Sequence, residues 1–243
     1  MSDNLIVILA GYDYSNCFDG LDDYEFKVIV PSNEPMLDDT SLENLRLALG
    51  DKLLSVPYKN MSDQLDKLRP DILITFGWRR IISEYIISLP RLAVNVHPAL
   101  LPEYKGYHPV PFVLSNNEEE HGITAHVIDR NLDSGPIVYQ EKFGIDKFTT
   151  LNKLQRQVNE LMPDFFKRLI VNLASGNFEL SENDNTKTKV IAGRRKPSDS
   201  EIPLDVTMDR AYDLIRASDS ERFPAFITID GRRFVIRLEE RND

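Results

Sequence analysis

The sequence predicts an α/β fold in which a doubly wound, mostly parallel sheet is followed by a small module of one helix and one hairpin. Two observations lead to this prediction. Short, unbroken apolar runs, typical of strands buried on both faces, alternate with segments of helical periodicity. A polar stretch then separates this alternation from a last helix and hairpin. Strands that alternate with helices indicate crossover connections, which parallel strands require.

The first hundred residues supply the parallel strands and their crossover helices. Strands are expected at Leu5–Ala10, Phe26–Val30, Asp71–Gly77 and Leu92–Pro98. Helices are expected at residues 42–50, 63–69 and 79–90, where apolar residues recur at helical spacing and a glycine or proline stands at or just after the end.

The middle of the chain has a different pattern. Residues 123–129 and 135–143 are an expected strand pair, and residues 149–176 are an expected long amphipathic helix. Pro163 lies inside this helix and is expected to kink or break it, because proline cannot donate a backbone hydrogen bond.

The C-terminal part begins with a polar connector at residues 181–189. A helix is expected over residues 208–220, and a hairpin is expected to turn at Asp230–Gly231. The predicted organisation is therefore a large domain over residues 1–185 and a small α+β module over residues 186–243.

Charge and cysteine content exclude some classes of protein. The 243 residues carry a formal net charge of −10, which argues against binding to a nucleic-acid backbone. Cys17 is the single cysteine, so neither an internal disulfide nor a cysteine-rich zinc site is expected. The sequence has no apolar run of about 18 residues and no basic, signal-like start. We therefore expect a cytoplasmic protein.

The segment NVHPALLPEYKG, which begins at Asn95, gives the first chemical signal. Residues two apart on a strand face the same way, so Asn95 and His97 project side by side just before Pro98 ends the strand. Ligands of open α/β folds bind beyond the carboxyl ends of strands. Histidine exchanges protons near neutral pH, and an asparagine amide can donate to an oxygen that gains charge.

A carboxylate that orients the histidine is expected in the segment DRNLDSGPI, which contains Asp129 and Asp133. Asp133 is preferred because it lies in a glycine-containing turn that can reach across a cleft. Two other interpretations stay open at this point. Asn95 and His97 could have structural roles only, or His97, His126 and Asp133 could bind a metal, although no HExxH motif or cysteine pair supports this.

Several motifs together resemble the folate-dependent formyltransferase family. That family has an Asn-x-His pair followed by a Leu-Leu-Pro segment, then a Thr-Gly-x-Thr-type strand and an Asp-x-Gly turn. This chain has NVHPALLPEYKG, HGITAHVID and LDSGPIVYQ in the same order between Leu73 and Phe143. Two positions depart from the pattern, since Ala99 stands where serine is common and His121 where threonine is usual.

The resemblance implies a formyltransferase-type, Rossmann-like fold and an enzyme that uses 10-formyltetrahydrofolate as co-substrate, without a metal. A primary amine would accept the formyl group. The resemblance implies that the catalytic residues are Asn95, His97 and Asp133. It also implies that the folate-binding residues are Arg80, Ile81, Ile82, Asp129 and Leu132.

The acceptor amine distinguishes three branches of the family. Phosphoribosylglycinamide formyltransferases of the purine pathway have a Gly/Ser/Asn-rich phosphate loop after the first strand, where this chain has AGYDYSNCFDGLDD. Initiator-tRNA formyltransferases have a larger, basic C-terminal domain, whereas this chain is acidic and has few residues after residue 185. The chain therefore resembles most the nucleotide-sugar N-formyltransferases, which act on amino sugars such as dTDP-sugars in O-antigen or polysaccharide biosynthesis. A purine-pathway enzyme and a catalytically silent folate- or nucleotide-binding protein are the alternatives.

The turn EYKGYHP is expected to contact the acceptor. The expected substrate-binding residues are Tyr104, Lys105, Gly106, Tyr107 and His108. Tyrosines can stack on a sugar or base, and the basic segment GRRKP (193–197) can add charge for a pyrophosphate. The ordinary alternatives are packing tyrosines and a solvated basic loop. No nucleic-acid or membrane partner is expected, and a homodimer is left open.

Overall fold

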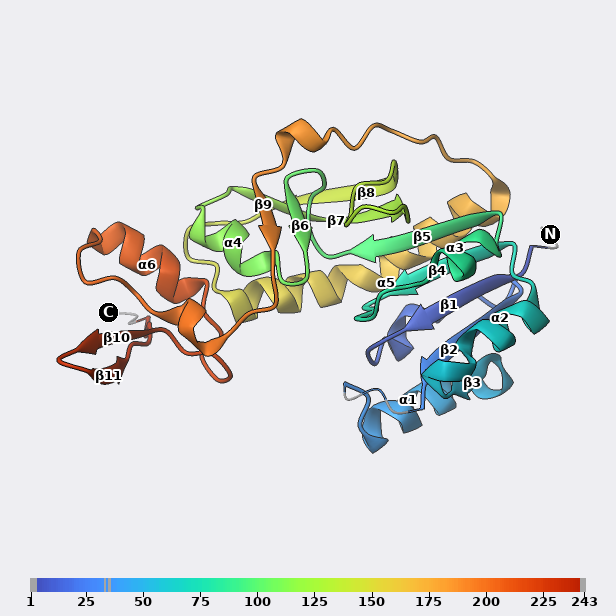
Figure 1. Cartoon of the computed structure of the whole chain (residues 1–243), viewed down its shortest axis with the longest axis horizontal. Helices are drawn as coiled ribbons and strands as arrows, with labels where there is room; N and C mark the ends of the chain where they lie inside the picture. Colours follow the sequence, from blue (N-terminus) through green and yellow to red (C-terminus); the bar gives the residue numbers. More distant parts are fainter. Residues whose placement is uncertain (1–3, 33, 35, 241–243) are drawn as a thin grey trace. The chain divides into compact units, whose positions relative to one another are not determined.

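The structure is a computed structural model that describes residues 4–32, 34 and 36–240. The chain forms two compact units (Figure 1). The first comprises Met1–His97, Ile123–Glu141 and Leu161–Asn183, and the second comprises Pro98–Gly122, Lys142–Glu160 and Asp184–Asp243. The chain thus changes unit several times. The last change, after Asn183, lies close to the boundary expected near residue 185.

A seven-stranded sheet is the framework of the first unit, as far as the chain is described. Its strands are β1 (Ile6–Ala10), β2 (Phe26–Pro31), β3 (Leu53–Val56), β4 (Ile72–Phe76), β5 (Leu92–His97), β7 (Glu120–Val127) and β8 (Ile137–Gly144). Their spatial order is β3-β2-β1-β4-β5-β7-β8. The strands from β3 to β5 pair in parallel, and β7 joins β5 antiparallel. The predicted mostly parallel α/β fold is confirmed.

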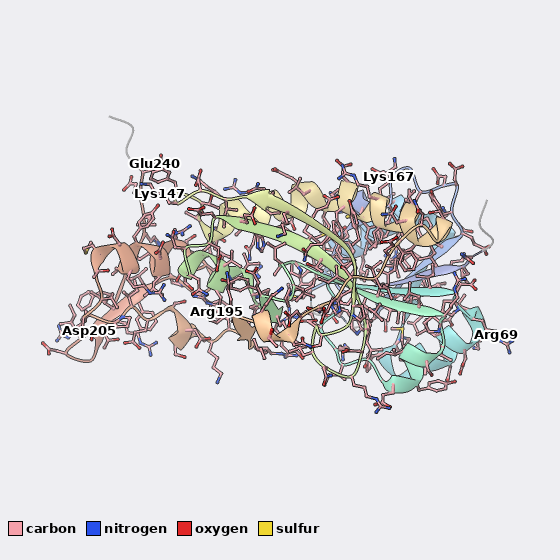
Figure 2. The ribbon with its side chains drawn as sticks, turned by 90° about the horizontal axis from the view of Figure 1, so that it is seen from above. Arg69, Lys147, Lys167, Arg195, Asp205 and Glu240 are labelled. Atoms are coloured by element: carbon pink, nitrogen blue, oxygen red, sulfur yellow. The ribbon has the colours of Figure 1, made fainter. Side chains whose placement is uncertain are left out.

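The described residues form six α-helices, and all of them except α4 follow the predicted order. They are α1 (Asp39–Leu49), α2 (Met61–Leu68), α3 (Glu84–Ser88), α4 (Val110–Ser115), α5 (Leu151–Ser175) and α6 (Met208–Arg216). The Asp38 carboxylate accepts a hydrogen bond from the Ser41 backbone N–H at 2.8 Å and so caps the start of α1. Arg69, labelled in Figure 2, ends α2 in the left-handed conformation with a φ of 48°.

Apolar side chains cover both faces of the sheet. On one face, Leu73 of β4 belongs to a buried cluster that includes Ile86 of α3. On the other face, Phe76 of β4 stacks on Phe166 of α5, with ring centroids 5.0 Å apart. Strands buried on both faces have no polar face to alternate with, which explains the unbroken apolar runs of the sequence.

Two elements of the first unit differ from the prediction. β3 was not expected, because its four residues lie at the edge of the sheet and are only partly buried. The helix expected over residues 79–90 is confined to Glu84–Ser88. Ser83 caps this helix by accepting a hydrogen bond from the Ile86 backbone N–H at 3.3 Å, so residues 79–82 lie in the loop after β4.

Helix α5 continues through Pro163, so the break that was one of the two expected outcomes does not occur. Leu154, Phe165 and Leu169 on its apolar face are fully buried. Each such side chain contributes about 1.5–3 kcal/mol, whereas a proline inside a helix costs about 3 kcal/mol. Burial of the apolar face therefore outweighs the proline. No helix in the described ranges is both long and apolar enough to cross a membrane.

The second unit has two small sheets. β6 (Tyr104–Gly106) pairs in parallel with β9 (Val190–Ala192), and β10 (Phe226–Ile229) forms an antiparallel hairpin with β11 (Arg232–Val235). The expected C-terminal helix and hairpin are both present, as α6 and β10–β11. β6, α4 and β9 were not predicted, because three to six residues are too few to show a clear period.

The hairpin turns as the sequence predicted. Asp230 and Gly231 have φ angles of 47° and 75°, which are the two left-handed positions of a tight two-residue turn. Asparagine, aspartate and glycine favour these positions.

Gly176→Ala should lower the free energy of unfolding by about 1 kcal/mol, because alanine adopts a left-handed conformation at roughly that cost. Gly176 has a φ of 68°, and an added Cβ would have no atom within 4 Å, so backbone strain is the expected cause. Gly193→Ala is the matched control, since its site is equally open and its φ lies outside the left-handed region. Urea unfolding followed by circular dichroism measures the free energy of unfolding of both variants. An equal loss in the two variants would contradict this account.

Candidate active site

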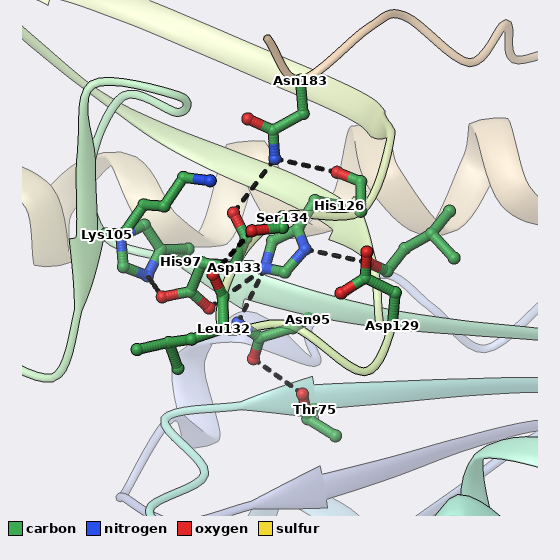
Figure 3. A network of polar contacts seen from close by, with 12 residues as sticks. Thr75, Asn95, His97, Lys105, His126, Asp129, Leu132, Asp133, Ser134 and Asn183 are labelled. Atoms are coloured by element: carbon green, nitrogen blue, oxygen red, sulfur yellow. Dashed lines mark hydrogen bonds and ion pairs between the residues drawn. The ribbon is translucent and has the colours of Figure 1, made fainter. Parts of the chain in front are cut away.

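The register of β4, β5 and β7 aligns a row of polar side chains. Thr75 lies opposite Asn95, and Asn95 lies opposite His126, so the three residues share one face of the sheet. The Thr75 hydroxyl donates to Asn95 Oδ1 at 2.7 Å. Asn95 Nδ2 lies 3.1 Å from His126 Nε2 (Figure 3). A hydrogen-bonded row therefore crosses three neighbouring strands.

Asp133 lies between two histidines. His97 ends β5, two residues after Asn95, and Asp133 lies in the loop between β7 and β8. Asp133 Oδ2 is 3.6 Å from His97 Nδ1, and its Oδ1 is 3.4 Å from His126 Nε2. No more than 10% of any of these three side chains is exposed. The structure thus brings together Asn95, His97 and Asp133, in surroundings where water weakens electrostatic interactions little.

The second aspartate of the loop has a different place. Asp129 is exposed, and its Oδ1 accepts a hydrogen bond from the Asn131 backbone N–H at 2.9 Å. This local bond closes a turn of the kind that aspartate favours. Of the two aspartates in the segment, Asp133 is therefore the one placed against His97.

The Asp133 loop makes a tight turn, in which Asp133 has a left-handed φ of 48°. Two features hold this turn in place. The Asn183 amide donates to the backbone carbonyls of Asp133 at 3.0 Å and of Gly135 at 2.9 Å. A Cβ added to Gly135 would lie 2.0 Å from the Val127 carbonyl oxygen, so only glycine lets the loop approach β7 this closely.

The hydrogen bonds of His126 define its neutral tautomer. His126 Nδ1 lies 2.9 Å from the Val127 carbonyl oxygen, which can only accept, so Nδ1 carries the proton. In the neutral ring, Nε2 then accepts from the Asn95 amide. The same nitrogen lies 3.4 Å from Asp133 Oδ1, so His126 contacts both Asn95 and Asp133.

Sequence reasoning missed part of this arrangement. His126 was considered only as a metal ligand, and Thr75 and Asn183 were not considered. Thr75 could have been found only with the β4–β5 register, which the sequence does not specify. Asn183 lies in the polar connector, where nothing distinguishes it from its neighbours. Across the described ranges, no cluster of three or more His, Cys, Asp or Glu side chains is arranged to hold a metal ion.

Arg80, which was predicted to bind folate, is held in the loop after β4. Its guanidinium lies 4.6 Å from the centroid of the Tyr58 ring, and its Nε is 3.6 Å from Oε2 of the buried Glu34. The Tyr58 hydroxyl donates to the Ile81 carbonyl at 2.9 Å. These contacts order a segment that has no regular secondary structure.

Exposed apolar side chains occur in this loop and in the Asp133 loop, and the loop after β4 also holds a buried donor. Ile81 is 84% exposed, and Leu132 in the Asp133 loop is 50% exposed. Ile82 instead packs against the core of the sheet. Trp78 Nε1 is buried and has no hydrogen-bond partner among the described residues. The exposed apolar side chains suit the face of a flat heteroaromatic ligand.

Three residues of the predicted acceptor turn serve the packing of the second unit. Tyr104 is buried, and its hydroxyl donates to Glu118 Oε1 at 2.5 Å. Burial is the main cause that raises the pKa of Tyr104 to about 12. Lys105 is buried and its ammonium contacts Asn185 Oδ1. Gly106 has a φ of 95°, and an added Cβ would lie 2.1 Å from the Ala192 carbonyl oxygen.

The other two residues of the turn lie against the basic segment. Tyr107 is 42% exposed, and the Arg194 guanidinium lies 5.0 Å from the centroid of its ring. His108 Nδ1 accepts a hydrogen bond from the Arg195 backbone N–H at 3.0 Å. The Arg195 side chain is used internally, because its guanidinium donates to Ser200 Oγ at 3.0 Å. Burial lowers the pKa of Arg195.

Cys17 has the properties of a packing residue. It is 2% exposed, and burial is the main cause that raises the pKa of its thiol to about 12. The thiol is therefore protonated at neutral pH and is a poor nucleophile.

Comparison with known proteins identifies the family of the central segment. Residues 54–170 match the family model described as "Formyl transferase". The methionyl-tRNA formyltransferase of Thermotoga maritima is 34% identical over 167 residues, which are 68% of this chain and 53% of that protein. The chain thus spans about half the length of the curated relatives it matches. The resemblance to formyltransferases found in the sequence is confirmed.

A solved sugar N-formyltransferase and a solved HypX share the fold. A sugar N-formyltransferase from Shewanella superposes with a TM-score of 0.79 at 19% identity, and the match covers 99% of both chains. HypX from Aquifex aeolicus, solved in complex with tetrahydrofolic acid, superposes with a TM-score of 0.67 at 15% identity. That match covers 96% of this chain and 37% of HypX.

Asn183→Ala should loosen the Asp133 loop, because two buried carbonyls lose hydrogen bonds worth about 1 kcal/mol each. Backbone amides of residues 129–136 should exchange with deuterium roughly tenfold faster, as hydrogen-exchange mass spectrometry can measure. Asn177→Ala is the matched control, since the Asn177 side chain is exposed. Unchanged exchange of this loop in Asn183→Ala would show that Asn183 does not hold it.

Proposed function

Residues 54–170 belong to the formyl transferase family, and on this premise we propose that the chain is a folate-dependent N-formyltransferase. It moves the formyl group of 10-formyltetrahydrofolate to the amino group of a nucleotide-linked amino-dideoxy sugar. The observation that carries this proposal is the convergence of Asn95, His97 and Asp133 inside the segment that matches the family.

Asn95 and His97 are the proposed donors to the oxygen that gains charge. The acceptor amine attacks the formyl carbon, a nitrogen–carbon bond forms, and the formyl oxygen becomes an oxyanion. An amide nitrogen has two N–H groups, and Asn95 directs one toward His126, so the other can meet the oxyanion. His97 faces Asp133 through Nδ1, and in the cationic ring both nitrogens are donors, so its Nε2–H is the proposed second donor. The row from Thr75 sets the orientation of the Asn95 amide.

Asp133 is the proposed proton acceptor. The attacking amine becomes cationic as its new bond forms, and Asp133 takes its proton through water. The same proton is returned to the folate nitrogen as the bond between that nitrogen and the formyl carbon breaks. The products are the formamide and tetrahydrofolate, with no net proton gained or lost. The carboxylate also stabilises the cationic form of His97.

The loop after β4 and the Asp133 loop are the proposed folate site. Ile81 and Leu132 offer exposed apolar surface. Arg80 adds positive charge in the same loop, and Asp129 shapes the turn that leads to Asp133. The Aquifex aeolicus HypX structure, which contains tetrahydrofolic acid, supports a folate for this fold.

The acceptor proposal rests on the second unit and on the Shewanella relative. The exposed ring of Tyr107 beside Arg194 offers a stacking surface and a positive charge, which suit a base or sugar joined to a pyrophosphate. Tyr104, Lys105 and Gly106 would support this surface from beneath, because they are buried in the turn. The Shewanella sugar N-formyltransferase matches this chain over 99% of both chains.

Formylation of methionyl-tRNA is the second candidate. It is favoured by the Thermotoga maritima enzyme, which is more identical to this chain than the sugar enzyme is. The charge distribution argues against it. The chain has a net charge of −10, and residues 184–243 contain as many acidic as basic residues, whereas a tRNA backbone attracts basic surfaces.

His97→Ala, Asn95→Ala and Asp133→Ala should each reduce turnover by roughly a hundredfold or more, the usual scale for a positioned donor or acid–base group. The double variants should lose far less than the product of the single losses, because the three groups act together. Asp129→Ala tests the other aspartate of the loop and should cost much less turnover than Asp133→Ala, because Asp129 only shapes the turn. Near-normal turnover in Asp133→Ala, with a loss in Asp129→Ala, would reverse the assignment of the two aspartates.

An acceptor panel tests the substrate. Release of tetrahydrofolate should be fast with a nucleotide-linked amino-dideoxy sugar and slow with the free sugar, because remote contacts position the reacting nitrogen. Glycinamide ribonucleotide and methionyl-tRNA, assayed side by side, should be poor acceptors. Turnover of methionyl-tRNA alone would favour the second candidate, and turnover of glycinamide ribonucleotide alone would favour a purine-pathway enzyme.

A further inference from the structure

Arg130, in the loop that carries Asp133, holds a carboxylate of helix α3. Its Nε lies 3.1 Å from Oε1 of Glu84, and its Nη2 donates to Oε2 of the same carboxylate at 3.4 Å. Two N–H groups therefore meet the two oxygens of one carboxylate, which is the geometry by which arginine recognises carboxylates. Glu84 lies in the first turn of α3, close after the loop that follows β4. The pair thus joins the two segments of the proposed folate site.

The contact between Arg130 and Glu84 is open to solvent. The Arg130 side chain is 83% exposed and the Glu84 side chain is 72% exposed. An exposed ion pair contributes little to stability, so another carboxylate can replace that of Glu84 at small cost. Arg130 is therefore a carboxylate-binding group whose partner is exchangeable.

The other two arginines of these loops are bound to groups inside the first unit. Arg80 Nε lies 3.6 Å from the buried carboxylate of Glu34, and taking an arginine away from a buried carboxylate is costly. Arg79 Nη1 donates to the Tyr12 hydroxyl at 3.3 Å. Arg130 differs from both, because its partner is an exposed carboxylate.

Arg130 is close in the chain to the proposed reacting centre. Asp133 lies beside His97, and the neighbouring Leu132 is 50% exposed (Figure 3). Three residues span at most about 10 Å, so Arg130 lies within that distance of Asp133. In 10-formyltetrahydrofolate, a p-aminobenzoyl group of similar length separates the formyl-bearing nitrogen from a glutamate with two carboxylates. A folate that reacts beside Asp133 can therefore bring a carboxylate to Arg130.

From these contacts we infer that Arg130 binds a glutamate carboxylate of the folate co-substrate, and that Glu84 occupies the same guanidinium when folate is absent. This inference rests on the proposed function, since it takes a folate as the ligand of the site. The pair opens as folate binds and closes as it leaves, because the two carboxylates compete for one guanidinium. A local cation also offsets the repulsion between an anionic folate and a chain with a net charge of −10.

Calorimetric titration with tetrahydrofolate and with tetrahydropteroate, which lacks the glutamate, tests the assignment. Arg130→Gln should weaken binding of tetrahydrofolate about fivefold and leave binding of tetrahydropteroate unchanged. Glu84→Gln should tighten binding of tetrahydrofolate about threefold, because the competing carboxylate is removed. The double variant Arg130→Gln/Glu84→Gln should lose this gain, since Glu84 acts only through Arg130. High salt should reduce the effect of Arg130→Gln, because it screens exposed charges.

Arg91→Gln is the matched control for the loss of one positive charge. Arg91 is also exposed, but it precedes β5 at the amino end of the strand, whereas His97 is at the other end. This variant should bind tetrahydrofolate as the unaltered protein does. Equal effects of Arg130→Gln and Arg91→Gln, or equal weakening of both ligands by Arg130→Gln, would overturn the glutamate assignment. Binding of neither ligand to the unaltered protein would contradict the folate site itself, and this inference with it.

Discussion

The hydrogen-bonded row from Thr75 through Asn95 to His126 is the interaction on which the candidate site depends. It exists because β4, β5 and β7 are paired in one register, so that three polar side chains on separate strands lie in line. A one-residue shift of any strand would turn its polar side chain to the opposite face. The buried apolar side chains of these strands hold the register, so the core of the sheet sets the chemistry.

The loop between β7 and β8 supplies the carboxylate of the candidate site. Asp133 reaches His97 and His126 because its loop turns back on β7 at Gly135 and is tied by Asn183. The turn at Gly135 and the Asn183 hydrogen bonds thus fix the position of the buried Asp133 carboxylate. This arrangement suits a reaction in which charge appears briefly and must be met by groups already in place.

The sequence predicted the parts of this site that local patterns encode. The two-residue spacing placed Asn95 and His97 on one face, and a glycine-containing turn favoured Asp133 over Asp129. Thr75 and Asn183 were missed because their roles depend on strand register and on a contact across 50 residues of chain. The short α3 shows the same limit, since its pattern covered 79–90 but the cap at Ser83 decided where the helix begins. The interleaving of two units likewise has no local signature.

The tautomer of His126 tests the central claim most directly. The four histidines of the chain can be labelled with ¹⁵N, and His126→Gln identifies the signal of that residue in two-bond ¹⁵N–¹H correlation spectra. The account predicts that the neutral ring carries its proton on Nδ1, bound to the Val127 carbonyl, and accepts from Asn95 on Nε2. A neutral ring protonated on Nε2 would contradict it, because the Asn95 amide could then not donate to His126.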